Sequence, residues 1–238
     1  MRSRRLTATA LAATALLSLT VLAGCQSMTA SASPSDDTAA EPAPPTVGAA
    51  WLEGGEALAI VVEGSSSCVP TLGDVSFAGD TLTVVAEVDD SGPCTADLAP
   101  HATYIPVPEG VSTMADLTVT VTGDVQGSTT LPGQPFPADA AGHTPGTPSA
   151  GWVSGMPGML VLETYGDPTA PPVFESAQVS GSMVEITVSA PTGPTSKTLL
   201  PTLTLVHVDG SVSSDAAEFH VSGTNVATAS GPIAGRPA

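Results

Sequence analysis

Short apolar runs separated by turn residues fill the chain from residue 57 onward. The runs are rich in Val, Ile, Leu and Thr, and the segments between them are rich in Gly, Pro, Asp and Ser. Residues 117–122 alternate Leu or Val with Thr, which is the period of a half-buried strand. Because no stretch keeps a helical period, the pattern predicts an all-β fold. The clearest strands are expected at residues 57–63, 74–78, 81–88, 102–107 and 117–122, with a hairpin turn at Gly79-Asp80.

A second set of marker residues follows the first at a nearly constant spacing. Trp51 recurs as Trp152, and the alternating run at 117–122 returns at 217–222. Four further pairs lie 101 positions apart: Gly54 and Gly155, Pro70 and Pro171, Pro93 and Pro194, and Pro100 and Pro201. Chance matches are common in a chain with 24 Gly and 23 Pro, but these pairs keep their order. The spacing favours a duplication into two tandem small antiparallel β-sandwich-like units; one continuous sandwich that shares strands is the alternative.

The first 25 residues have the pattern of an export signal. Arginines at positions 2, 4 and 5 precede an apolar run over 6–21, which ends at Leu22-Ala23-Gly24-Cys25. This tetrapeptide resembles the lipobox of bacterial lipoproteins. The resemblance implies that Cys25 carries diacylglycerol on its sulfur, with palmitate as an acyl chain, and becomes the N-terminus after cleavage. Two acyl chains would hold the protein on the extracytoplasmic face of the cell membrane. The general secretory route is favoured over the twin-arginine route.

These observations divide the chain into six segments. Residues 26–49 are rich in Ser, Ala and Pro and have little to bury, which predicts a disordered tether. The expected organisation is a signal peptide at 1–24, a lipid-anchored tether at 25–49, a first β domain at 50–124, a Pro/Gly-rich linker at 125–150, a second β domain at 151–225 and a C-terminal tail at 226–238.

The charge of the chain excludes several classes of partner. Lys and Arg total 5 against 23 Asp and Glu, and residues 6–196 contain no Lys or Arg. Binding to nucleic acid or to anionic headgroups requires clustered cations, so both are excluded. A protein partner is expected to be basic, and a cell-wall component is the other candidate. No cofactor is expected, and the oligomeric state is left open.

The cysteines separate by role. With Cys25 assigned to lipid by the resemblance, Cys68 and Cys94 remain as an even pair in an oxidising compartment, which predicts a structural disulfide. A redox or nucleophilic thiol is the alternative, although no neighbouring His or basic residue would lower its pKa.

Candidate chemistry is sparse. Asp89, Asp90 and Asp97 supply oxygen ligands that calcium prefers, although their spacing is also that of a solvated turn beside an edge strand. His207 and Asp209 share one face of an expected strand, where a metal or general-base role competes with a plain surface position.

Trp51 and Trp152 precede the first strand expected in each unit. Each is either an exposed stacking platform for glycan or peptide or the core residue of its unit. The function expected from the whole pattern is a lipid-anchored, non-catalytic binding or structural module of the cell envelope. An exported hydrolase or a calcium-binding surface protein that uses the acidic loop residues is the alternative.

Overall fold

The protein is all-β, as its sequence predicts. The computed structural model describes residues 47–89, 91–135, 146–190, 200–209 and 217–237, which contain β strands and one short 3-10 turn, η1 (Glu53–Gly55). We call residues 47–135 the first half and residues 146–237 the second half. Within these described ranges, no helix is long and apolar enough to cross a membrane.

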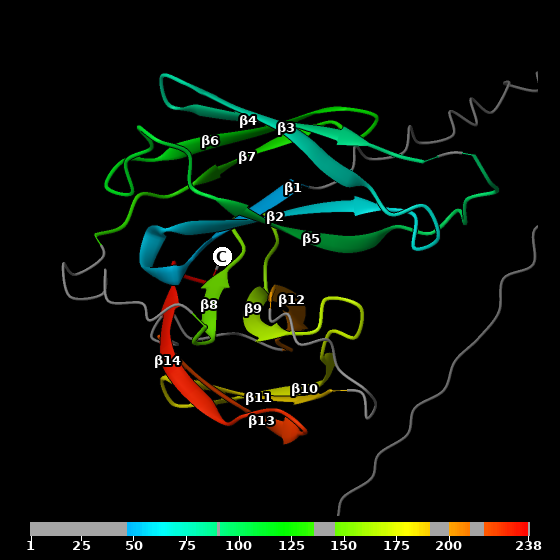
Figure 1. Cartoon of the computed structure of the whole chain (residues 1–238). Helices are drawn as coiled ribbons and strands as arrows, with labels where there is room; N and C mark the ends of the chain where they lie inside the picture. Colours follow the sequence, from blue (N-terminus) through cyan, green and yellow to red (C-terminus); the bar gives the residue numbers. More distant parts are fainter. Residues whose placement is uncertain (1–46, 90, 136–145, 191–199, 210–216, 238) are drawn as a thin grey trace, which may run out of the picture. The chain divides into compact units, whose positions relative to one another are not determined.

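The first half forms two sheets (Figure 1). One sheet has the order β1-β2-β5 and the other the order β3-β4-β6-β7, in which β4 and β6 are parallel and the other neighbours antiparallel. Their bounds are β1 (Val47–Leu52), β2 (Ala57–Gly64), β3 (Thr71–Ala78), β4 (Thr81–Glu87), β5 (Ala99–Pro106), β6 (Leu117–Gly123) and β7 (Gly127–Leu131).

The second half repeats this pairing. Strands β8-β9-β12 and β10-β11-β13-β14 pair in the same order and directions as β1-β2-β5 and β3-β4-β6-β7. An added parallel pairing between β14 and β8 joins them into one seven-stranded sheet. The bounds are β8 (Ser149–Trp152), β9 (Met159–Gly166), β10 (Val173–Ser180), β11 (Met183–Ser189), β12 (Leu200–His207), β13 (Glu218–Thr224) and β14 (Ala229–Ala234).

Each half has its own apolar core, built from alternate strand positions. In the first half, Leu82, Val84 and Ala86 of β4 pack with Leu58 and Ile60 of β2 and with side chains from β1, β5, β6 and β7. In the second half, β8, β9, β11, β12, β13 and β14 supply the corresponding core. The period of two along these strands therefore directs every second side chain inward.

A third apolar cluster lies between the halves. The opposite faces of β1 and β2 are also apolar, which is why every residue of β1 is buried. These faces pack against side chains of the second half. We call the resulting cluster the inter-half interface. Its members are Ala50, Leu52, Ala57, Ala59, Val61, Val153, Met156 and Val161. Two backbone hydrogen bonds between Ala49 and Ser154, of 3.1 and 2.8 Å, reinforce it.

Several segment boundaries differ from the sequence-based expectation. Strand β1 begins within the segment expected as tether, β7 and the start of β8 lie in the expected linker, and β14 lies in the expected tail. Strands β7 and β14 have the sequences GSTTL and ASGPIA, in which small and polar residues mask the apolar alternation. The signal peptide, most of the tether with Cys25, and Asp90 lie outside the described residues.

Candidate functional site

Cys68 and Cys94 form a disulfide, as the sequence predicts. A polar cluster surrounds it: Thr95 Oγ1 donates to Asp97 Oδ1, the Ser66 amide donates to the same oxygen (3.3 Å), and the Thr95 amide donates to Ser67 Oγ (2.9 Å). These hydrogen bonds join the two loops that the disulfide links. The geometry gives the cysteines a structural role.

Two of the three acidic residues expected to bind calcium accept hydrogen bonds from neighbouring loop residues, and the third, Asp90, lies outside the described residues. Asp89 Oδ1 accepts the Ser91 amide hydrogen (3.0 Å), which lowers the pKa of Asp89. Hydrogen bonds from Ser66 and Thr95 lower the pKa of the exposed Asp97 carboxyl to about 2. In the described ranges, no three His, Cys, Asp or Glu side chains gather where a metal ion could be held. The calcium hypothesis, which also involves Asp90, stays a prediction.

Both tryptophans are core residues. Trp51 in β1 and Trp152 in β8 are only 1% and 2% exposed, each within the core of its own half. The Trp51 indole Nε1 donates a hydrogen bond to the carbonyl oxygen of Pro132 (3.0 Å). A stacking platform needs an exposed ring face, so the surface-binding alternative for these residues is corrected.

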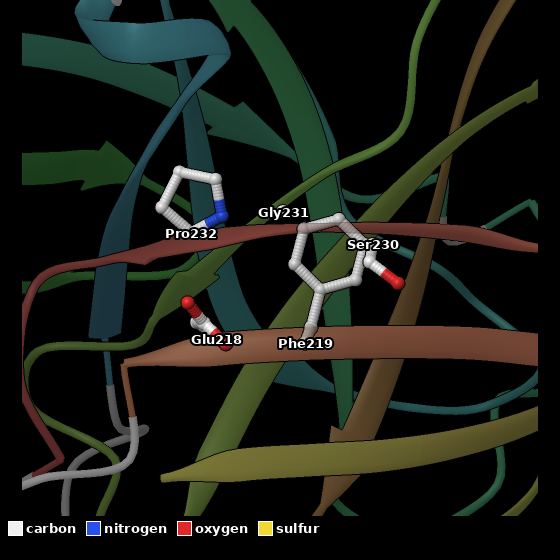
Figure 2. A pocket seen from close by; sticks show the side chains of 5 residues that line it. All are labelled: Glu218, Phe219, Ser230, Gly231 and Pro232. Carbon is white, nitrogen blue, oxygen red and sulfur yellow. The ribbon is translucent and has the colours of Figure 1, made fainter.

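Two further candidates lie at the surface. His207 Nε2 and Asp209 Oδ1 are 3.4 Å apart, but both side chains are largely exposed. A hollow of about 250 Å³ lies on the β13–β14 pair and is lined by Glu218, Phe219, Ser230, Gly231 and Pro232. Figure 2 shows these residues. Phe219 lies opposite Gly231, and its ring occupies the space beside the missing glycine side chain. An aromatic ring that covers a cross-strand glycine is a common packing arrangement in sheets. Neither the His207–Asp209 pair nor this hollow therefore brings together a set of catalytic or ligand-binding side chains.

The most unusual polar cluster joins the two halves beside the inter-half interface. Glu53, in η1 of the first half, is 8% exposed, and Glu163, on β9 of the second half, is fully buried. Ser149 on β8 connects them: its Oγ accepts the Glu53 amide hydrogen (3.2 Å) and donates to Glu163 Oε2 (2.5 Å). Glu163 Oε1 has no hydrogen-bond partner among the described residues.

Two tyrosines complete this cluster, one from each half. The Tyr104 hydroxyl on β5 donates to Glu53 Oε2 (2.9 Å), and the Tyr165 hydroxyl on β9 donates to Glu53 Oε1. Hydrogen bonds of this kind favour the ionised form of the accepting carboxyl. The two hydroxyl donors therefore favour the ionised form of Glu53. Burial, and then the hydrogen bond to Glu53, raise the pKa of both tyrosines.

The environment of Glu163 favours its neutral form. Burial raises the pKa of Glu163 to about 7, with help from the charge of Glu53 and the hydrogen bond to it, while the hydroxyls of Ser149 and Tyr165 act in the opposite direction. Ionisation of both carboxyl groups in one buried site has a high free-energy cost, because the two negative charges repel each other. The cluster thus retains one proton up to near-neutral pH.

Sequence reasoning missed this cluster. The available signal was Glu163 itself, which interrupts the apolar run Met-Leu-Val-Leu of β9. Glu53 and Tyr104 lie 110 and 59 positions earlier in the chain, and no local pattern links them to it. Comparison of the chain with protein-family models, with curated proteins and with solved structures found no match.

Proposed function

We propose that the protein is a lipid-anchored, non-catalytic binding or structural module on the extracytoplasmic face of a bacterial membrane. In this proposal, Cys25 carries the lipid, a tether follows, and two related β-sandwich-like units project from the membrane. The five strand pairings of the first half recur in the second, which supports an origin by duplication.

The observation that carries this proposal is the single sign of the exposed charge. Every carboxylate in the described residues is exposed except those of Glu53, Glu63, Glu163 and Asp167, and that part of the chain contains a single Lys or Arg residue, Arg236. A field of one sign steers partners of the opposite sign and repels like-charged ones. A basic envelope protein, or a cell-wall component with cationic groups, is the partner of matching chemistry.

Lipid attachment is tested by metabolic labelling. Cells that express the full chain are fed an alkyne-tagged palmitate, and the protein is then recovered for detection of the tag. We expect labelling of the wild type and of Ser27→Ala, and none of Cys25→Ala. Labelling that persists in Cys25→Ala would remove the lipobox interpretation.

The binding role is tested by crosslinking in intact envelopes. A photo-reactive residue replaces Asp89, and the control carries it at Asp116, an exposed loop residue of the same charge. Saturable crosslinking of a basic partner from one of these two positions and not the other, with a yield that falls as salt is added, would support the proposal. Capture of no partner at low and moderate salt would favour a passive surface protein or an exported hydrolase, and the search for a substrate would then begin.

A further inference from the structure

We propose that Glu53 and Glu163 form a proton-dependent latch between the two halves: one proton shared by the carboxyl groups keeps the inter-half interface closed, and loss of that proton loosens it. The latch goes beyond the binding role, because it concerns how the two halves stay together.

The contacts that define the latch cross between the halves. Glu53 of the first half reaches the second through its amide on Ser149 and its carboxylate on Tyr165. Glu163 lies one step along the same face of β9 from Val161, which is part of the inter-half interface. A change of charge on Glu163 therefore acts directly on the packing between the halves.

The groups around Glu163 are acids and hydroxyls. Glu53 comes from η1, Ser149 from β8, Tyr165 from β9 itself and Tyr104, through Glu53, from β5. Glu56, just after η1, adds a further negative charge that acts on Tyr104. A second ionisation in this cluster places two negative charges in a site of low polarity, where repulsion is poorly screened.

The direction of the pH effect follows from the raised pKa of Glu163. Its ordinary value is 4.5 and its value in the folded protein about 7. Between these values the folded protein holds a proton that the unfolded chain has lost, so stability falls as pH rises. The contribution is complete below about pH 4.5 and is lost above about pH 7.

The latch is tested by chemical labelling of a buried thiol in the interface. Ala59 on β2 is fully buried in the inter-half interface, and Ala86 on β4 is fully buried in the core of the first half. Full-length protein carrying Ala59→Cys or Ala86→Cys is purified in detergent and treated with iodoacetamide at about pH 5.5 and about pH 8. Because only the thiolate reacts, each rate is divided by the rate of a free thiol measured at the same pH.

We expect the corrected rate at Ala59→Cys to rise roughly tenfold or more between the two pH values, while the rate at Ala86→Cys stays constant. Glu163→Gln, which is neutral at every pH, should abolish the rise. An unchanged rate at Ala59→Cys would overturn the proposal. A rise that persists with Glu163→Gln, or that occurs equally at both thiols, would also overturn it.

A second measurement needs no cysteine variant. We expect the melting temperature of the wild type to fall from about pH 5 to about pH 8, and that of Glu163→Gln to fall much less. Glu185→Gln, which removes an exposed acid of β11, is the matched control and should follow the wild type. Parallel pH curves for Glu163→Gln and wild type would contradict the latch.

Discussion

A single hydroxyl, that of Ser149, connects the backbone of the first half to a carboxyl group of the second. Ser149 pairs with Glu163 between β8 and β9, and the equivalent pair between β1 and β2 is Gly48 with Val61. The cross-strand pair at this position is polar in the second half and apolar in the first. The buried cluster therefore arises from residues that distinguish the two halves rather than from what they share.

Removal of this hydroxyl should destabilise the protein in a pH-dependent way. In Ser149→Ala, Glu163 loses a hydrogen bond that favours its ionised form, so its pKa rises further and the cost is larger above pH 7. We expect a loss of about 1–3 kcal/mol at pH 8 and a smaller loss near pH 5.5, measured by urea unfolding. Ser128→Ala, an exposed position on β7, should change little at either pH. Equal losses at the two pH values would contradict this role.

At the scale of the strands, the alternating pattern was a reliable guide. Strands β2, β4 and β6 lie within about two residues of the expected positions. In β4 and β6 apolar side chains recur at every second place, and in β2 they form a continuous run because both of its faces are buried. The parallel pairing of β4 with β6 was not predictable, since it joins strands separated by β5 in the chain. Strand order depends on packing between residues far apart in the chain, and the local alternation of apolar and polar residues does not reveal it.

A glycine lies at or next to the end of two of the parallel pairings, β4 with β6 and β11 with β13. Gly123 lies opposite Ala86, and Gly223 opposite Val188, at equivalent places in the two halves. Gly223 has a φ of 152°, and a Cβ there would lie 1.6 Å from the Val188 carbonyl oxygen. The neighbouring strand therefore comes too close for any side chain at this position.

Substitution of this glycine should be costly. We expect Gly223→Ala to lower the free energy of unfolding by about 1–3 kcal/mol, because backbone must shift to admit the methyl group. Gly92→Ala is the control, since a Cβ at position 92 meets no atom within 4 Å. Guanidinium unfolding of both variants measures the difference. Similar stabilities would mean that β11 and β13 separate more easily than their pairing indicates.

At the scale of the whole molecule, the halves share buried surface but differ in their covalent links. The disulfide closes a loop of the first half, and its counterpart positions in the second half carry Thr169 and Thr195. The inter-half interface consists of aliphatic side chains, none more than 7% exposed. Separation of the halves would expose all of them, so we expect the halves to unfold together.

Loss of the disulfide should therefore affect the entire fold. The double variant Cys68→Ala, Cys94→Ala removes a crosslink worth about 3–4 kcal/mol in the chain-entropy model. We expect calorimetry to show one transition at a lower temperature than in the wild type. Chemical reduction of the wild type should give the same shift. Two separated transitions would show that the interface does not couple the halves.

The scarcity of Lys and Arg has a consequence for resistance to proteases. Proteases of the trypsin type select their cleavage sites by placing a Lys or Arg side chain in an acidic pocket. No such side chain occurs in residues 6–196, and Arg236 is followed by Pro237, which impairs cleavage of the bond between them. Most of this chain therefore contains no cleavage site for such enzymes, whether or not it is folded.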